Sequence, residues 1–261
     1  MAKGNQDSKT DPRGMLLQGK VALVTGGSLG IGTAIVLDFA SQGADVAFTY
    51  RRHEDEARQI ATQVEGMGRR ALPLKADVSS FDDAQSLVDE VVEKLGGLDI
   101  LVNNAGMNWD GVIWKMTEEQ WDRVISVDLK GCFNYIRAVA PIFREQASGK
   151  IVNITSINGL RGKFGQSNYT AAKGGVIALT KTVARELGRF SINVNAVAPG
   201  LIETPMVKEA PENVREMALA EIVLGRLGQP EEVAWVVTFL CSEMARHITG
   251  EVITVDGGQY I

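Results

Sequence analysis

Short apolar runs rich in β-branched residues alternate along the chain with longer stretches that have the periodicity of amphipathic helices. The apolar runs are predicted strands, at 21–25, 45–50, 71–75, 99–103, 150–154, 192–196 and 251–255. The longer stretches are predicted helices, at 31–41, 54–65, 81–95, 117–126, 130–146, 171–187 and 230–242. Strands that are apolar throughout and alternate with helices indicate βαβ units. We therefore predict an α/β fold: a Rossmann-type, doubly wound, seven-stranded parallel sheet with helices on both faces.

One domain accounts for nearly all of the chain, because no Pro/Gly/Ser-rich linker or internal repeat interrupts residues 16–261. We expect residues 1–15 to form a flexible, polar N-terminal arm, since they lack the apolar region of a signal peptide. No apolar run approaches the length of a membrane span. The sequence therefore predicts a cytoplasmic protein without a membrane partner.

Composition removes several other classes of function. Lys and Arg number 27 against 32 Asp and Glu, and a net charge of −5 without a basic block argues against nucleic-acid binding. The two cysteines, Cys132 and Cys241, lie far apart, which excludes a disulfide scaffold and a cysteine zinc site. The chain has two histidines, so we expect neither His-dependent catalysis nor a metal site.

A glycine-rich turn, Thr25-Gly-Gly-Ser-Leu-Gly-Ile-Gly32, follows the first predicted strand and leads into the first predicted helix. Glycines let the backbone turn tightly and approach a pyrophosphate, which then meets free N–H groups at the helix N-terminus. A glycine cluster is also found in plain strand-to-helix turns. Its position after the first strand favours a dinucleotide-binding site.

The tip of the second strand carries Tyr50-Arg51-Arg52 and no acidic residue. An acidic side chain at this place binds the ribose 2′-hydroxyl of NAD, whereas arginine accepts the 2′-phosphate of NADP. NADP(H) is therefore the favoured cofactor, and NAD(H) stays open. The alternative is that both arginines merely solvate a loop, and Glu54 and Asp55 weaken the local positive potential.

Tyr169 and Lys173 share one face of a predicted helix, one turn apart. A tyrosine has a pKa of roughly 10, and a nearby cation lowers it, which makes Tyr169 a candidate acid or base. Ser156 follows the fifth predicted strand, where ligands of doubly wound sheets bind. The trio predicts reduction of a carbonyl group, with Ser156 holding its oxygen and Tyr169 protonating it. An ordinary helix face is the alternative for the Tyr169–Lys173 pair alone.

Several motifs in order make the chain resemble the short-chain dehydrogenase/reductase family across roughly residues 18–261. They are TGGSLGIG at 25–32, Asp77 in ADV, Asn103-Asn-Ala-Gly106, Ser156, YTAAK at 169–173, Pro199-Gly200 and DGG at 256–258. The stretch 151–169 and the region 121–125 are especially similar to acetoacetyl-CoA reductases and 3-oxoacyl-[acyl-carrier-protein] reductases.

The resemblance implies a set of cofactor contacts and a catalytic set. The cofactor contacts are Gly26, Ser28, Leu29, Gly30, Ile31, Gly32, Tyr50, Arg51, Arg52, Asp77, Val78, Asn104, Ala105, Gly106, Tyr169, Lys173, Pro199, Gly200, Ile202 and Thr204. The catalytic residues are Ser156, Tyr169, Lys173 and Asp128. In this scheme Lys173 holds the nicotinamide ribose and lowers the pKa of Tyr169.

Two departures from the family pattern stand out. The family usually has an asparagine where this chain has Asp128, and an ionised aspartate accepts hydrogen bonds but donates none. The change is tolerable if the backbone carbonyl carries the role; otherwise activity or its pH dependence shifts. Many NADPH-using relatives also place an arginine in the glycine turn, where this chain has Leu29, so Arg51 and Arg52 must bind the phosphate alone.

The predicted substrate contacts are Ser156, Asn158, Gln166, Tyr169 and Met206, the last in an amphipathic stretch that starts after the sixth strand. The leading hypothesis is NADPH-dependent reduction of a 3-oxoacyl thioester, acetoacetyl-CoA or 3-oxoacyl-[acyl-carrier-protein], to the 3-hydroxyacyl thioester. One alternative is a dehydrogenase of a sugar, steroid or cyclic secondary alcohol. Another is a non-catalytic NADP(H)-binding regulatory protein. The resemblance also implies a homotetramer.

Overall fold

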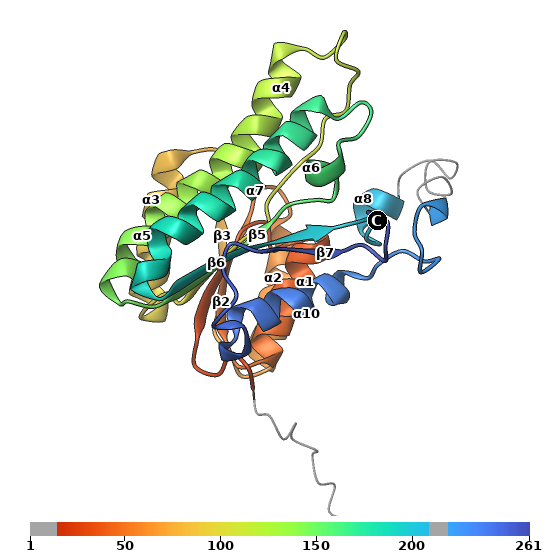
Figure 1. The fold of residues 1–261 in the computed structure, drawn as a ribbon. Coiled ribbons are helices and arrows are strands. Elements are labelled where there is room, and N and C mark those ends of the chain that lie inside the picture. The colour runs from red at the N-terminus through yellow and green to blue at the C-terminus, as the bar shows by residue number, and fades with distance from the viewer. Residues whose placement is uncertain (1–14, 209–218) are drawn as a thin grey trace, which may run out of the picture.

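A parallel sheet of seven strands forms the centre of the computed structural model, which describes residues 15–208 and 219–261 (Figure 1). The strand order is β3-β2-β1-β4-β5-β6-β7. The strands are β1 Val21–Val24, β2 Asp45–Tyr50, β3 Ala71–Lys75, β4 Ile100–Asn103, β5 Gly149–Ile154, β6 Ile192–Pro199 and β7 Val252–Val255. The order turns back between β1 and β4, which is where doubly wound sheets bind their ligands. The predicted fold is confirmed.

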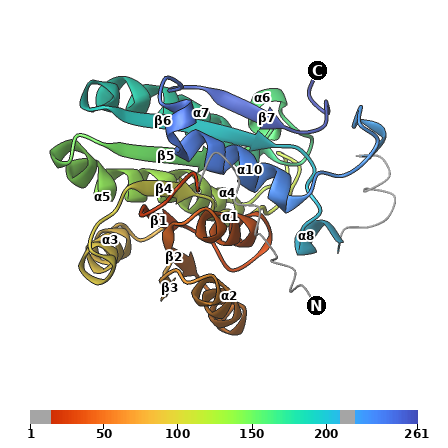
Figure 2. The same ribbon diagram turned by 90° about the horizontal axis from the view of Figure 1, so that it is seen from below.

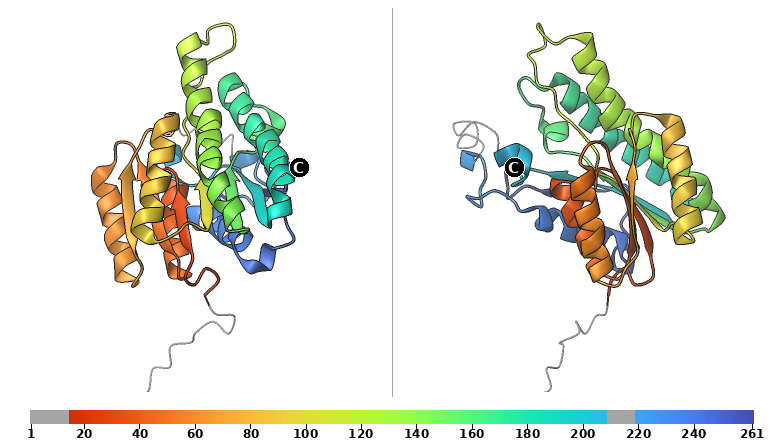
Figure 3. Two further views of the ribbon diagram at one scale, coloured as in Figure 1. Left: turned by 90° about the vertical axis from the view of Figure 1, so that its left-hand side faces the viewer. Right: turned by 180° about the vertical axis from the view of Figure 1, so that it is seen from behind.

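Helices cover both faces of the sheet, as the views in Figures 2 and 3 show. One face carries α1 (Gly30–Ser41), α2 (Glu54–Gly66) and α10 (Pro230–Cys241), whose apolar side chains share one buried cluster. The other face carries α3 (Phe81–Leu95), α5 (Gly131–Glu145) and α7 (Ser167–Leu187), which share a second. Because both faces are covered, strands such as β1 and β4 are buried at every position, as their continuous apolar sequence predicts.

The long helical region after β4 differs from the prediction. The sequence pattern predicts two separate helices, at 117–126 and 130–146. The structure has α4 (Glu118–Val124), a π-helical turn η1 (Ile125–Lys130) and then α5, with no break between them. A capping box starts α4, since the Thr117 side chain accepts from Gln120 N–H and the Gln120 side chain accepts from Thr117 N–H. The π-turn places Asp128 on the buried side.

Several short elements complete the described part of the chain: α6 (Asn158–Arg161), η2 (Gly188–Phe190), α8 (Pro205–Lys208) and η3 (Glu243–Ala245). Two longer elements extend beyond their predicted bounds. Helix α7 begins at Ser167 rather than at residue 171, and β6 continues to Pro199 rather than to residue 196. Both extensions carry predicted site residues toward the same edge of the sheet. None of the described helices combines the length and apolar character that crossing a membrane requires.

Candidate active site

The carboxyl ends of the central strands bring the predicted site residues to one edge of the sheet. Thr25 follows β1 and Asn104 follows β4, while Ser156 follows β5 and Pro199 ends β6. The loop after β1 is tied to the loop after β4, because the Asn104 amide donates to the carbonyls of Thr25 at 3.0 Å and Gly26 at 2.9 Å. These bonds join the two loops where the strand order turns back.

Ser156, Tyr169 and Lys173 lie together at this edge. Ser156 is buried and its hydroxyl shares a hydrogen bond with the half-buried Tyr169 phenol. The Ser156 Oγ also accepts from the Asn158 N–H at 3.1 Å, at the start of α6. Lys173 is buried, its Nζ donates to the Ile154 carbonyl at 3.1 Å, and it lies 5.6 Å from the centre of the Tyr169 ring. A hydroxyl, a phenol and an ammonium group therefore lie close together at the carboxyl edge of the sheet.

Asp128 joins this group from the π-turn. Its carboxylate is fully buried, and Oδ2 lies 3.2 Å from Lys173 Nζ. Its Oδ1 accepts the Met107 N–H at 2.8 Å. Burial is the largest single effect on Lys173 and favours its neutral form, but the Asp128 charge, the hydrogen bond with Asp128 and smaller contributions from neighbouring groups together raise the pKa of Lys173 above its usual range. Burial also raises the pKa of Asp128, although Lys173 and Met107 oppose this.

The balance at Tyr169 differs from the expectation drawn from Lys173 alone. Burial raises the pKa of Tyr169, Lys173 lowers it, Asp128 raises it, and the hydrogen bond with Ser156 lowers it. The net direction is upward, because burial and the Asp128 charge together exceed the effect of the ammonium. Tyr169 is therefore a protonated phenol at neutral pH, the form that can donate a proton.

Buried polar side chains that sequence reasoning missed hold this group in place. Asn103 on β4 donates to Asn153 on β5 at 2.8 Å, and Asn153 donates to Thr180 on α7 at 2.9 Å. The Thr155 hydroxyl donates to the carbonyl of Lys173 at 2.8 Å. Fixed polar atoms on three elements thus orient α7 against β5. Asparagines near the carboxyl ends of two otherwise apolar strands are the sequence signal for this network.

The glycine turn has the shape that a dinucleotide requires. Gly26 and Gly30 have φ of +66° and +55°, and a side chain on Gly26 would lie 2.9 Å from the Ala105 Cα. Leu29 precedes α1 with an exposed side chain, and among the described residues none caps the first turn or places an acidic group there. The uncapped N–H groups of α1 are therefore free to meet an anion. Ser28 is buried, Ile31 is partly buried, and Gly32 packs against the carbonyl of Gly26.

Arg51 and Asp77 meet at the other end of this site. Arg51 lies 3.3 Å from Asp77, which also pairs with Arg123 at 3.2 Å. Burial opposes ionisation of Asp77, but hydrogen bonds from Ser79 and Arg123 and the charge of Arg51 lower its pKa to about 2. Arg52 is exposed and forms no ion pair within residues 15–208 and 219–261.

The remaining residues that are predicted to contact a cofactor border the same edge. Tyr50 ends β2, where its carbonyl accepts the Ala76 N–H at 3.0 Å, and the buried Val78 packs beneath Gly131 of α5. Ala105 donates its N–H to the Thr25 hydroxyl at 3.0 Å. Gly106, Gly200, Ile202 and Thr204 lie in the loops after β4 and β6. The Thr204 methyl approaches Gly30 of the glycine turn, so these loops face each other.

The predicted substrate residues form a chain of hydrogen bonds. The Asn158 amide donates to Gln166 Oε1 at 3.1 Å, and Gln166 Nε2 donates to the Asp110 carboxylate at 3.2 and 3.1 Å. Asn158 and Gln166 therefore border the site and connect it to the loop after β4. The side chain of Met206 and the stretch 209–218 lie outside the described residues.

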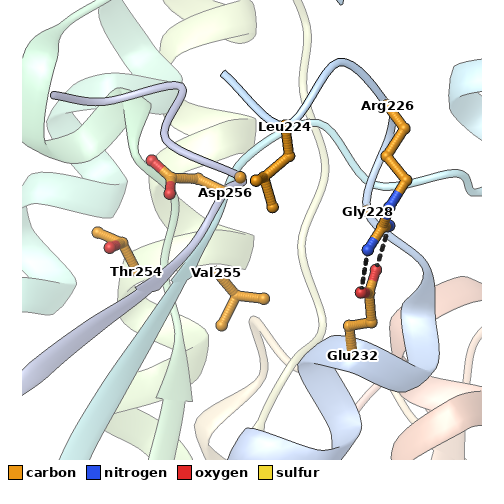
Figure 4. A pocket seen from close by; sticks show the side chains of 8 residues that line it. Leu224, Arg226, Gly228, Glu232, Thr254, Val255 and Asp256 are labelled. Atoms are coloured by element: carbon orange, nitrogen blue, oxygen red, sulfur yellow. Dashed lines mark hydrogen bonds and ion pairs between the residues drawn. The ribbon is translucent and has the colours of Figure 1, made fainter. Parts of the chain in front are cut away.

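A cavity of about 220 Å³ lies elsewhere, between β7 and the segment before α10 (Figure 4). Its lining includes Arg226 and Glu232, which form a bidentate pair at 2.8 and 2.6 Å. The third charged lining residue, Asp256, accepts the N–H groups of Gly258 and Tyr260. Because the cavity contains none of the predicted site residues, it does not compete with the Ser156 edge. In the described part of the chain, no three His, Cys, Asp or Glu side chains gather as metal ligands.

Comparison with known proteins agrees with this geometry. Residues 26–259, which include the glycine turn and all seven strands but β1, match the family model described as Enoyl-(Acyl carrier protein) reductase. The chain belongs to the short-chain dehydrogenase/reductase family. It is therefore an NAD(P)-dependent oxidoreductase, and the predicted class of enzyme is confirmed.

Curated relatives cover almost the whole chain. The 3-oxoacyl-[acyl-carrier-protein] reductase FabG of Thermotoga maritima is 47% identical over 247 residues, 95% of this chain and 100% of the relative. The protein of the same name from Staphylococcus epidermidis is 43% identical over 242 residues, 93% of this chain and 99% of the relative. An uncharacterized oxidoreductase of Mycobacterium bovis is 44% identical over 246 residues, 94% of this chain and 99% of the relative.

Proposed function

We propose that this short-chain dehydrogenase/reductase reduces a 3-oxoacyl thioester to the 3-hydroxyacyl thioester, with NADPH as cofactor. The observation that carries the proposal is the Ser156–Tyr169–Lys173 group at the carboxyl edge of a sheet whose near full-length relatives are named 3-oxoacyl-[acyl-carrier-protein] reductases. The substrate class follows from those relatives, whereas the chemistry follows from the side chains.

Four side chains have separate roles in the proposed reduction. Ser156 donates a hydrogen bond to the carbonyl oxygen of the substrate and so stabilises the charge that develops there. Tyr169 gives its phenolic proton to the same oxygen. Lys173, fixed between the Ile154 carbonyl and Asp128, stabilises the resulting tyrosinate. Asn158 holds Ser156 through its N–H, and its side chain links the site to Gln166.

The glycine turn and the β2 tip fit a dinucleotide. The uncapped start of α1 would hold the pyrophosphate, and Asp77 and Val78 would border the adenine. When bound, the nicotinamide supplies the hydride. Arg52, exposed and unpaired among the described residues, supports a 2′-phosphate and hence NADPH; Arg51 can share that phosphate while it contacts Asp77. NAD(H) remains the alternative cofactor.

A cytoplasmic homotetramer is part of the same proposal. Phe81 of α3 and Phe133 of α5 are exposed, with ring centres 6.3 Å apart. Trp235 of α10 and Met244 of η3 are also exposed, at 60% and 59%. Exposed apolar residues on two different faces support two kinds of contact between copies.

The deciding experiment is a spectrophotometric assay of NADPH and NADH oxidation with acetoacetyl-CoA, beside a panel of sugars, steroids and cyclic ketones. We expect rapid oxidation of NADPH with the thioester. Turnover of the cyclic or sugar substrates alone would keep the chemistry and discard the thioester. Cofactor binding without turnover of any carbonyl would favour a regulatory protein instead.

A further inference from the structure

A second charged group lies directly behind the proton donor. The Asp128 carboxylate is fully buried, and so is the Lys173 ammonium that faces it at 3.2 Å. Within the described residues, Oδ2 has this ammonium as its partner and accepts no further hydrogen bond, while Oδ1 accepts the Met107 N–H. One carboxylate oxygen is thus devoted to Lys173.

The pair is packed against the backbone that borders the cofactor side of the site. A Cβ on Gly106 would lie 2.8 Å from Asp128 Oδ2 and 3.2 Å from Lys173 Nζ. The glycine therefore lies against the carboxylate and the ammonium together. Two opposite charges this close, away from water, act on their surroundings more weakly than a lone cation does.

We propose that Asp128 sets the pH range of the enzyme by offsetting part of the charge of Lys173, so that Tyr169 gives up its proton at a higher pH than beside an unpaired lysine. Asp128 acts through Lys173 and is a positioning residue. The kinetic form of this inference rests on the proposed reductase function, but the state of the Tyr169 phenol does not.

Few other charges face the group. From α7 it meets Lys173 and Tyr169, and from α5 the buried Cys132, whose thiol pKa is raised to about 12 by burial and which stays neutral. Asp110, in the loop after β4, acts on Tyr169 but is exposed and hydrogen-bonded by Gln166. On α4, Arg123 pairs with Asp77 instead. Asp128 is therefore the buried anion of this group.

The test is Asp128→Asn, which keeps the size of the side chain and an acceptor for the Met107 N–H while removing the charge. The pH dependence of kcat/KM is measured for oxidation of 3-hydroxybutyryl-CoA, the direction in which Tyr169 must first lose its proton. With the carboxylate gone, the ammonium stabilises tyrosinate without opposition. We expect the acid-side pKa to fall by about one unit, which raises the rate below that pKa by up to about tenfold.

The control is Asp89→Asn on α3, which removes the same charge from an exposed position and should leave the profile unchanged. A purely structural role for Asp128 predicts a lower kcat at every pH with an unmoved profile, and this result would overturn the proposal.

A second measurement needs no substrate. Ultraviolet absorbance of tyrosinate is titrated in the protein and in its Tyr169→Phe variant, and the difference isolates Tyr169. The same pair is compared in the Asp128→Asn background. A lower Tyr169 pKa there supports the inference even if thioesters prove to be the wrong substrates. An identical pKa in both backgrounds refutes it even if thioesters are reduced. Should Asp128→Asn fail to fold, Asp128→Ser serves with the same expected outcomes.

Discussion

Arg161 of α6 and Glu221 form an ion pair at 2.9 Å, which joins the short helix after Ser156 to the segment that precedes α10. Arg161 also donates to Asn158 Oδ1 at 3.3 Å and to the Gln259 carbonyl at 3.2 Å. We expect Glu221→Gln to raise KM for acetoacetyl-CoA by up to about fivefold, the range of an exposed ion pair, with the Kd of NADPH unchanged. Steady-state kinetics and cofactor fluorescence measure both, and Glu231→Gln on α10 is the control. A change in NADPH binding without a change in KM would contradict a role of this ion pair in positioning Asn158 beside the substrate.

Removing the Tyr169 hydroxyl should separate binding from chemistry. Tyr169→Phe keeps the ring beside Lys173 but lacks the proton, so we expect a loss of about 10²- to 10⁴-fold in kcat. The Kd of NADPH, measured by fluorescence, should change by no more than about twofold, because a substitution that disrupts no structural feature changes a free energy by about 0.5 kcal/mol or less. Tyr260→Phe, near the C-terminus, is the matched control. Turnover retained in Tyr169→Phe would exclude it as the proton donor.

Arg52 offers a test of cofactor choice. Hydrogen bonds to charged groups contribute about 1.5–3 kcal/mol, so Arg52→Ala should lower kcat/KM for NADPH by about 10- to 150-fold. The value for NADH should stay the same, because NADH lacks the 2′-phosphate. Arg58→Ala on α2, where the guanidinium pairs with Glu54, removes the same charge without this effect. Equal losses with both cofactors would point to a role outside phosphate recognition.

Asp77 should make stability depend on pH. Its pKa in the folded chain is about 2, below the unfolded value of 3.8, so the folded state favours the ionised form. The stabilisation is therefore full above the unfolded pKa and is lost as pH falls through about 2. We expect Asp77→Asn to lower the free energy of unfolding at pH 7 by about 1 kcal/mol, given partial screening by solvent. Denaturant titrations at pH 7 and pH 3 should show a smaller difference at the lower pH.

Two glycine substitutions with opposite outcomes test the turn. At Gly32 a side chain would collide with the Gly26 carbonyl, so Gly32→Ala should lower stability and abolish NADPH binding. At Gly66, near the end of α2, a side chain has no atom within 4 Å. Gly66→Ala should stabilise the protein by roughly 0.5–1 kcal/mol, since alanine favours helix. Thermal melts with and without NADPH read both effects.

The pattern of apolar residues predicts those helices and strands whose bounds depend only on their own sequence. The strands Asp45–Tyr50 and Ala71–Lys75 and the helix Phe81–Leu95 have the predicted bounds, because their apolar periodicity and turn residues lie within the segments themselves. The four-residue helix Asn158–Arg161 was missed, since it is too short to show a period. The early start of α7 was missed too, since buried Asn168 bonds to distant carbonyls of Trp109 and Gln120.

The sequence predicts which side chains gather at this edge of the sheet, but not how their charges are paired. Ser156, Tyr169, Lys173 and Asp128 do meet, yet the ion pair of Lys173 with Asp128 joins residues on different elements, and no spacing in the sequence indicates it. The raised pKa of Tyr169 results from burial and from the charges of that pair, which depend on the folded structure and cannot be seen in the sequence. The contact of Arg51 with Asp77 likewise depends on how β2 and β3 align.

The helix between Thr117 and Gln146 contains a π-turn at Ile125–Lys130. This turn is wider than those of a regular α-helix, because its backbone hydrogen bonds span one more residue. The two halves of this helix are consequently out of phase, and the extra residue is absorbed at the six positions that include Asp128. Deleting one of them would restore the regular ladder of backbone hydrogen bonds and rotate the carboxylate away from Lys173. Such a shortened protein could gain helix regularity and lose its chemistry together, because here the phase of a helix decides which side chain faces the ammonium.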